Sequence, residues 1–173
     1  MTDILLFIGF LSIFIGGVLG LYETKIKRLL AYSGISHTGF MILALSLGSF
    51  SGIEAFFVYF FTYLLTLINI FYILIFFRLS TFYFKLVYIT DFIVLAKSNT
   101  FVTLNLFFLF LSLAGVPPFP GFFGKALVLK SLIESGYYYI PAFIIFFSVI
   151  NIVYYLRLCV FYFLFLLILT LFL

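Results

Sequence analysis

Tryptophan is absent from this chain of 173 residues, cysteine and histidine occur once each, and charged residues make up only 8% of the sequence. The single Cys159 lies in an apolar run, cannot form an intrachain disulfide and is expected to be a small packing residue. One cysteine and one histidine exclude a metal cluster or a haem-ligand pair within the chain. No nucleophile, base and acid occur as a set, and no basic patch is long enough to bind nucleic acid. The sequence therefore gives no sign of a redox centre, a hydrolytic site or a bound cofactor in this chain.

Apolar residues are abundant in place of the missing polar ones. Hydrophobic residues make up 67% of the chain, and the mean hydropathy is +1.42. Soluble domains carry about a quarter charged residues, so lipid must be the solvent here. In lipid the backbone must satisfy its own hydrogen bonds, and continuous rather than alternating apolar runs favour helices over a barrel. The composition predicts an all-α integral membrane protein, and its 29 Phe and 13 Tyr are typical of the AT-rich codons of an organelle genome.

The apolar runs predict about five transmembrane helices in a single membrane domain. Each helix needs roughly 20 apolar residues to cross a core about 30 Å thick. Small residues at 48–52 form a turn signal, and the mixed segment 80–99 suits an interfacial loop or a surface-lying helix. No turn signal follows Arg157, so one long tilted helix is expected there rather than a separate sixth span. The expected spans are 4–22, 30–47, 54–77, 100–136 and 139–165.

The fourth of these spans is expected to be discontinuous. A helix from 100 to 136 would be roughly 55 Å long, nearly twice the thickness of the membrane core. Pro117, Pro118 and Pro120 stand near its middle, where they remove backbone donors and disfavour helical geometry in the residues before them. We therefore expect two half-helices joined by an irregular segment at membrane depth.

The charged residues provide an internal check of this topology. With five alternating spans, seven basic residues fall on one side of the membrane, while the opposite loops at 48–53 and 135–138 contain no lysine or arginine. Such segregation is the usual pattern in membrane proteins, and the basic side is the cytoplasmic or matrix-type side. The seven residues are Lys25, Lys27, Arg28, Arg78, Lys85, Lys97 and Arg157.

Lys125 is the candidate of greatest interest because it falls close to the middle of the membrane core. It lies about 11 residues before the end of the second half-helix, or roughly 16 Å at helical rise. One interpretation is a structural lysine that bends to an interface or pairs with a neighbouring subunit. The other is a proton relay, because intramembrane ionisable residues usually face the bundle interior or a hydrated path. Burial and the positive N-terminal end of its half-helix are expected to disfavour its charged form, whereas the carbonyls freed around Leu113 to Val116 favour it.

Two further residues are weaker candidates for a proton path. Lys130 is either an exit-side relay or a side chain that reaches the interface, where Glu134 at i+4 can pair with it. His37 is either a packing residue or a relay that holds water together with Ser33, Ser36 and Thr38.

Polar residues also occur along the third span. Hydrogen bonds between helices are the expected role of these residues, which are Tyr59, Thr62, Tyr63, Thr66 and Asn69.

Three segments resemble the antiporter-like membrane subunits of respiratory complex I. They are the basic loop and following helix at 26–41 (IKRLLAYSGISHTGFM), the broken-helix motif at 112–125 (SLAGVPPFPGFFGK), and the next helix at 148–157 (SVINIVYYLR). Their order and spacing are most similar to the subunit 2 type of this family, over nearly the whole chain. The resemblance implies part of a fourteen-helix fold, of which this chain corresponds to the ninth to thirteenth helices.

The resemblance also implies a function for the motif residues. The family's lysine of the second broken helix, which belongs to its chain of charged residues for proton translocation, corresponds to Lys125, and its histidine after the basic loop corresponds to His37. Flavin, iron-sulfur clusters and quinone are expected in other subunits of the complex. The expected partners are other membrane-arm subunits, lipids and a separate polypeptide that supplies the preceding helices, all in the mitochondrial inner membrane.

The resulting hypothesis is a non-redox subunit of proton-pumping NADH:ubiquinone oxidoreductase that contributes part of a proton path through Lys125. Two alternatives remain open at this point. One is a purely structural membrane subunit without a pumping role of its own, and the other is a subunit of a cation/proton antiporter complex.

Overall fold

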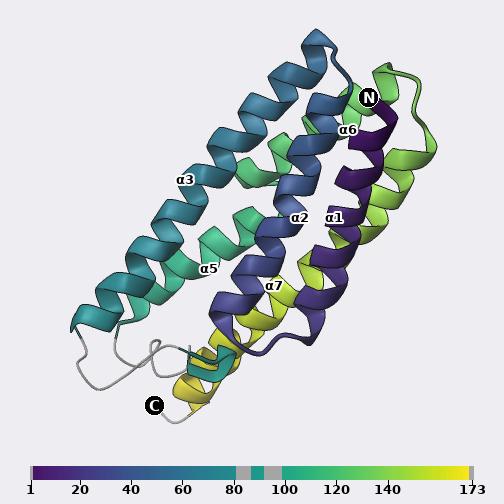
Figure 1. The fold of residues 1–173 in the computed structure, drawn as a ribbon. Coiled ribbons are helices and arrows are strands. Elements are labelled where there is room, and N and C mark those ends of the chain that lie inside the picture. The colour runs from purple at the N-terminus through teal and green to yellow at the C-terminus, as the bar shows by residue number, and fades with distance from the viewer. Residues whose placement is uncertain (1, 81–86, 92–98, 172–173) are drawn as a thin grey trace.

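The computed structural model describes residues 2–80, 87–91 and 99–171, and side chains within 2–76, 87–91 and 99–160. The described residues form helices and no named strand, which confirms the all-α prediction (Figure 1). In chain order the helices are α1 (Thr2–Tyr22), α2 (Ile26–Ser46), α3 (Phe50–Ser80), the short 3-10 helix η1 (Ile89–Asp91), α5 (Thr100–Ala114), α6 (Pro120–Glu134) and α7 (Tyr139–Leu171).

Four of the described helices, α1, α2, α3 and α7, are long and apolar enough to cross a membrane. Helices α5 and α6 have 15 residues each, or roughly 22 Å, so neither crosses a core of about 30 Å by itself. They are the two halves of the expected discontinuous span, with Pro117 and Pro118 between them and Pro120 as the first residue of α6. Beyond Arg157 the chain continues as one helix to Leu171 without a break.

Two helix starts differ from the hydropathy-based expectation. Helix α2 begins at Ile26 rather than near residue 30, because the Ile26 N–H donates to Val87 O at 3.0 Å and the helix extends beyond its apolar part. Helix α3 begins at Phe50 rather than near 54, because Ser49 Oγ accepts the Gly52 N–H at 3.1 Å and caps the first turn. Helix α3 therefore begins within the segment 48–52 that was predicted to be a turn, because hydropathy does not detect a capping residue.

The helices pack as an antiparallel bundle. Helix α1 packs most extensively on α2, α3 packs on α6, and α7 lies against both α1 and α5. Figure 1 shows the α1–α2 connection and the C-terminus at one end of the bundle, and the α2–α3 and α6–α7 connections at the other. One buried apolar cluster includes Leu113 and Ala114 at the end of α5, and a second includes Val128 and Leu132 of α6. The break between α5 and α6 therefore lies where the two clusters meet.

Backbone contacts tie the basic end of the bundle together. Arg157 donates to Leu21 O at 3.0 Å and to Glu23 O, and so fastens α7 to the α1–α2 connection. The segment containing η1 docks on the same connection, where the Ile89 N–H donates to Thr24 O at 3.0 Å. These contacts place Lys25 and Arg157 at one end, as the charge pattern predicts. Lys85, Lys97 and the Arg78 side chain lie outside the described residues, as does most of the expected interfacial segment 80–99.

We predict that Arg157→Ala loosens this end of the bundle. Each hydrogen bond from a charged group contributes about 1.5–3 kcal/mol, so we expect a loss of about 1–3 kcal/mol for this half-buried side chain. Thermal unfolding of the purified protein in detergent measures the change. The control is Lys27→Ala, because Lys27 is exposed at the same end and should change stability by less than about 0.5 kcal/mol. Equal melting of the two variants would contradict the anchoring role of Arg157.

Candidate functional site

The break between α5 and α6 is built by the local sequence. Helix α5 ends at Gly115, whose φ of 82° is left-handed, and its N–H donates to Leu111 O and Ser112 O. The Val116 N–H also donates to Leu111 O at 3.2 Å, which closes the C-terminal turn. Helix α6 then begins with Pro120 in its first turn, where the missing N–H costs nothing. Glycine and proline thus end one half-helix and start the next within five residues.

The two central prolines free the carbonyls that receive Lys125. In a continuous helix, Leu113 O and Ala114 O would accept the N–H groups of residues 117 and 118, which are prolines and have none. Lys125 Nζ donates to these same two oxygens, at 3.2 Å to Leu113 O and 2.7 Å to Ala114 O. The sequence expectation that freed carbonyls surround Lys125 is therefore correct in geometry.

Lys125 is buried and held without an acidic partner in the described part of the chain. Its exposed fraction is 6%, and Nζ lies 5.7 Å from the centroid of the Phe40 ring of α2, within the range of a cation–π contact. The ion pair found among the described side chains is Lys130 with Glu134, at 3.7 Å on the outside of α6. Backbone dipoles and an aromatic face, rather than a carboxylate, therefore surround the ammonium group.

Close backbone approach keeps the two half-helices in contact. A Cβ at Gly121 would lie 1.9 Å from Ser112 O, so the first turn of α6 could not rest on the end of α5 with any other residue. The Gly121 N–H is 3.4 Å from Ser112 Oγ, which accepts it. This contact sets the distance across which Lys125 reaches back to α5.

His37 lies between two tyrosines from other helices. Its Nδ1 is 2.7 Å from the hydroxyl of Tyr59 on α3, and its Nε2 is 3.3 Å from the hydroxyl of Tyr155 on α7. The ring of Tyr63 stacks on the imidazole with centroids 4.7 Å apart. Both nitrogens of the His37 ring therefore form hydrogen bonds with tyrosine hydroxyl groups.

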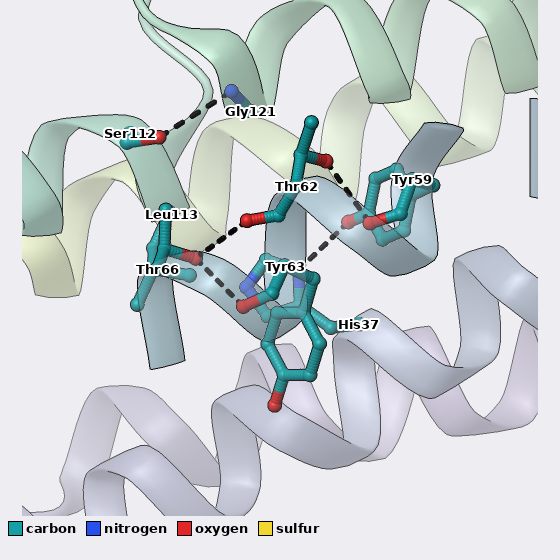
Figure 2. Close-up of a pocket in the computed structure, with 8 residues that line it drawn as sticks. All are labelled: His37, Tyr59, Thr62, Tyr63, Thr66, Ser112, Leu113 and Gly121. Carbon is teal, nitrogen blue, oxygen red and sulfur yellow. Dashed lines mark hydrogen bonds between the residues drawn. The ribbon is translucent and has the colours of Figure 1, made fainter. Parts of the chain in front are cut away.

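A small pocket connects the histidine with the broken helix. Figure 2 shows residues of α2, α3, α5 and α6 around it, with His37 and Tyr59 on one side and Ser112 and Gly121 on the other. Leu113 lines the same pocket, and its carbonyl oxygen accepts a hydrogen bond from the Lys125 ammonium group. The space suffices for about one water molecule. The pocket therefore brings together the surroundings of His37 and Lys125.

Several expectations about individual partners are wrong. Ser33 and Thr38 form no direct hydrogen bond with His37, and their hydroxyls donate to Leu30 O and Ile35 O of their own helix. Thr38 directly follows His37, and adjacent residues in a helix point about 100° apart, so these two side chains face different directions. On α3, the side chains of Thr62, Thr66 and Asn69 likewise donate to carbonyls of α3 rather than to other helices.

Lys130 lies at the surface and not in the pocket. Its side chain is 69% exposed and pairs with Glu134, which is the simpler of the two interpretations left open by the sequence. Sequence reasoning also missed Tyr155 and Asn151 of α7, although Asn151 donates to Ser36 Oγ at 2.7 Å across the bundle. A polar amide within an apolar span was the available signal for Asn151.

Among the residues that the structure describes, no three His, Cys, Asp or Glu side chains are placed to hold a metal ion. The described residues form a polytopic helical membrane protein in which a buried lysine is hydrogen-bonded to the end of a broken helix. The family described as NADH:quinone oxidoreductase/Mrp antiporter, TM, matches residues 1–151, and the chain belongs to this family. The resemblance to antiporter-like subunits of complex I is thereby confirmed.

The relatives are subunits of quinone oxidoreductases. The chain is 38% identical to NADH-ubiquinone oxidoreductase chain 2 of Rhizopus oryzae over 162 residues, which cover 90% of this chain and 31% of that protein. It is 34% identical to NADH-quinone oxidoreductase subunit N of Hydrogenovibrio crunogenus, covering 90% and 32%. It superposes on a chain of respiratory complex I from Thermus thermophilus, solved with bound aureothin, with a TM-score of 0.80, 30% identity and coverage of 94% and 36%. The chain thus spans about a third of the length of these relatives.

We predict that Gly115→Ala is more damaging than Gly136→Ala. Both glycines have left-handed φ values, 82° and 85°, so each alanine costs about 1–2 kcal/mol in backbone strain. A Cβ at Gly115 would also lie 2.9 Å from Lys125 Cδ and 3.0 Å from Nζ, whereas one at Gly136 meets no atom within 4 Å. Thermal unfolding of the two variants isolates this steric part. Equal destabilisation would mean that the Lys125 side chain moves freely out of the way.

Proposed function

We propose that the chain is a membrane-arm subunit of proton-translocating NADH:ubiquinone oxidoreductase and contributes part of a proton path through Lys125. It carries out no redox chemistry itself. Energy released by quinone reduction in other subunits shifts charges along the membrane arm, and Lys125 responds by taking up or releasing a proton. His37, which shares the pocket beside the helix break, is the second group of this path.

The observation that carries the proposal is the placement of Lys125. A lysine in the middle of a membrane helix costs about 2.5–3.5 kcal/mol, so a sequence retains one at such depth for a reason beyond packing. Its two hydrogen bonds go to carbonyls that the break itself supplies, and no carboxylate fixes its charge among the described residues. Such an ammonium group can exchange its proton when nearby charges change.

The proposed assembly includes more than this chain. The chain spans about a third of the curated relatives' length, and helices outside these residues complete the proposed proton path. Other membrane-arm subunits and lipids cover the remaining apolar surface. The proposed location is the mitochondrial inner membrane, in keeping with the chain 2 relative of a fungus and the Phe-rich, Trp-free composition.

The family description also includes Mrp antiporters, so a subunit of a cation/proton antiporter complex is the second candidate. The two are separated by purification of the native complex from its membrane. Flavin and iron-sulfur proteins in the complex support the oxidoreductase. Sodium-dependent proton exchange without NADH oxidation would support the antiporter.

We predict that Lys125→Ala and Lys125→Gln abolish the contribution of this subunit to pumping. The glutamine keeps a donor for the α5 carbonyls but cannot exchange a proton, so it separates loss of relay from loss of packing. The measurement is the ratio of protons pumped to NADH oxidised in vesicles that contain the assembled complex. If both variants assemble and keep the wild-type ratio, the relay role is wrong and the chain is a structural subunit.

We further predict that Lys130→Ala keeps the wild-type pumping ratio. Its ammonium group is exposed and its pair with Glu134 is a surface pair, which contributes less than about 1 kcal/mol to stability. The same vesicle assay measures this variant. If Lys130→Ala lowers the ratio of protons pumped to NADH oxidised as much as Lys125→Gln does, Lys130 belongs to the proton path.

A further inference from the structure

The His37 ring is hydrogen-bonded at both nitrogens by phenols from different helices. Tyr59 reaches Nδ1 at 2.7 Å and Tyr155 reaches Nε2 at 3.3 Å, and all three side chains are 3% exposed or less. In a neutral imidazole one nitrogen donates and the other accepts, while a phenol hydroxyl does both. The arrangement is therefore satisfied in either tautomer, with the hydroxyls turning to match.

The hydroxyl groups of Tyr59 and Tyr155 lie next to different parts of the protein. Tyr59 lines the pocket that also includes Leu113, whose carbonyl holds Lys125. Tyr155 lies on α7, where Ser33 of α2 is the neighbour of its hydroxyl. Two residues further along α7, Arg157 contacts Leu21 O at the basic end of the bundle. The three residues thus lie between the broken helix and the basic half of the protein.

We infer that Tyr59, His37 and Tyr155 form a proton bridge between the pocket beside Lys125 and the basic end of the bundle. The inference deepens the proposed function and rests on it. Neither tyrosine belongs to the polar residues that the sequence itself singled out as a proton path, and Tyr155 was not a candidate at all.

Each transfer in the bridge conserves charge. The Lys125 ammonium group gives a proton to a water molecule in the pocket, this water passes one proton to the Tyr59 oxygen and returns to its neutral form, and the phenol's own proton moves to His37 Nδ1. The proton on Nε2 then moves to the Tyr155 oxygen while the proton of Tyr155 moves to the Ser33 oxygen, and Ser33 releases its own hydrogen, which points at Leu30 O, to a water molecule on the side of the basic end. One proton enters and one leaves. The next proton follows after the imidazole has returned to its first tautomer.

Packing holds all three rings independently of their hydroxyl groups. The Tyr59 ring stacks on Phe40 at 5.6 Å, the Tyr155 ring stacks on Phe110 at 6.2 Å, and the imidazole stacks on Tyr63 at 4.7 Å. Replacement of either bridging tyrosine by phenylalanine therefore removes the proton carrier and keeps the packing. Tyr63 offers a matched control, because it contacts the same histidine through its ring face.

The decisive experiment measures protons pumped per NADH oxidised in vesicles that contain the assembled complex. We expect Tyr59→Phe and Tyr155→Phe to lower this ratio by as much as Lys125→Gln, and Tyr63→Phe to leave it unchanged. If Lys125→Gln lowers the ratio while both bridging variants pump normally, the bridge is wrong and the proposed function stands. If Tyr63→Phe lowers the ratio equally, the loss does not depend on a hydroxyl that bonds the imidazole, which also overturns the bridge. If Lys125→Gln pumps normally, the proposed function itself fails.

A spectroscopic measurement tests the bridge without reference to pumping. His37 is the only histidine of the sequence, so the full chain in lipid bilayers with ¹⁵N-labelled histidine gives one pair of ring-nitrogen signals. We expect Tyr59→Phe to shift the Nδ1 signal and Tyr155→Phe to shift the Nε2 signal, with Tyr63→Phe altering neither hydrogen bond. Unchanged signals in both bridging variants would show that the hydroxyls do not bond the imidazole.

Discussion

The contact between the Lys125 ammonium group and two carbonyls at the end of α5 is the constraint on which the site depends. Placing a lysine at the centre of a membrane helix costs about 2.5–3.5 kcal/mol. Hydrogen bonds from a charged group contribute about 1.5–3 kcal/mol each, so the bonds to Leu113 O and Ala114 O are of the size needed to offset that cost. The carbonyls are available because Pro117 and Pro118 cannot donate to them. A break in the helix and a charge in the membrane therefore stabilise each other.

The same contact explains the small residues around the break. Gly115 adopts the left-handed conformation that ends α5, and its lack of a side chain leaves room for the Lys125 stem. Gly121 allows α6 to rest on Ser112. Helix α2 then adds the Phe40 ring near the ammonium group. The two glycines allow the short distance between the half-helices, which is why the motif is dense in small residues.

Outside the break, polar contacts across the bundle fix how the helices are turned toward one another. Asn151 of α7 donates to Ser36 of α2, Arg157 of α7 donates to the α1–α2 connection, and the two tyrosines engage His37 from α3 and α7. In lipid these contacts matter because apolar side chains gain little by packing on each other instead of on acyl chains. The polar groups therefore provide much of the orientational specificity that a water-soluble core obtains from burial.

The class of protein, the helix break and the segregation of charge can be predicted from the amino-acid sequence, because each follows from local chemistry. Apolar runs must be helical in lipid, prolines remove donors wherever they stand, and Lys125 is deep in the membrane by its distance along the chain. The helix starts at Ile26 and Phe50 were missed, since a cap or a distant carbonyl sets them and hydropathy does not. The partners of His37, and the hydrogen bonds of Thr62 and Thr66 to their own helix, are visible only in the folded structure. Helices that are apolar on all sides have no amphipathic pattern that would show which face points into the bundle. Their rotation is therefore fixed by contacts between segments far apart in the chain.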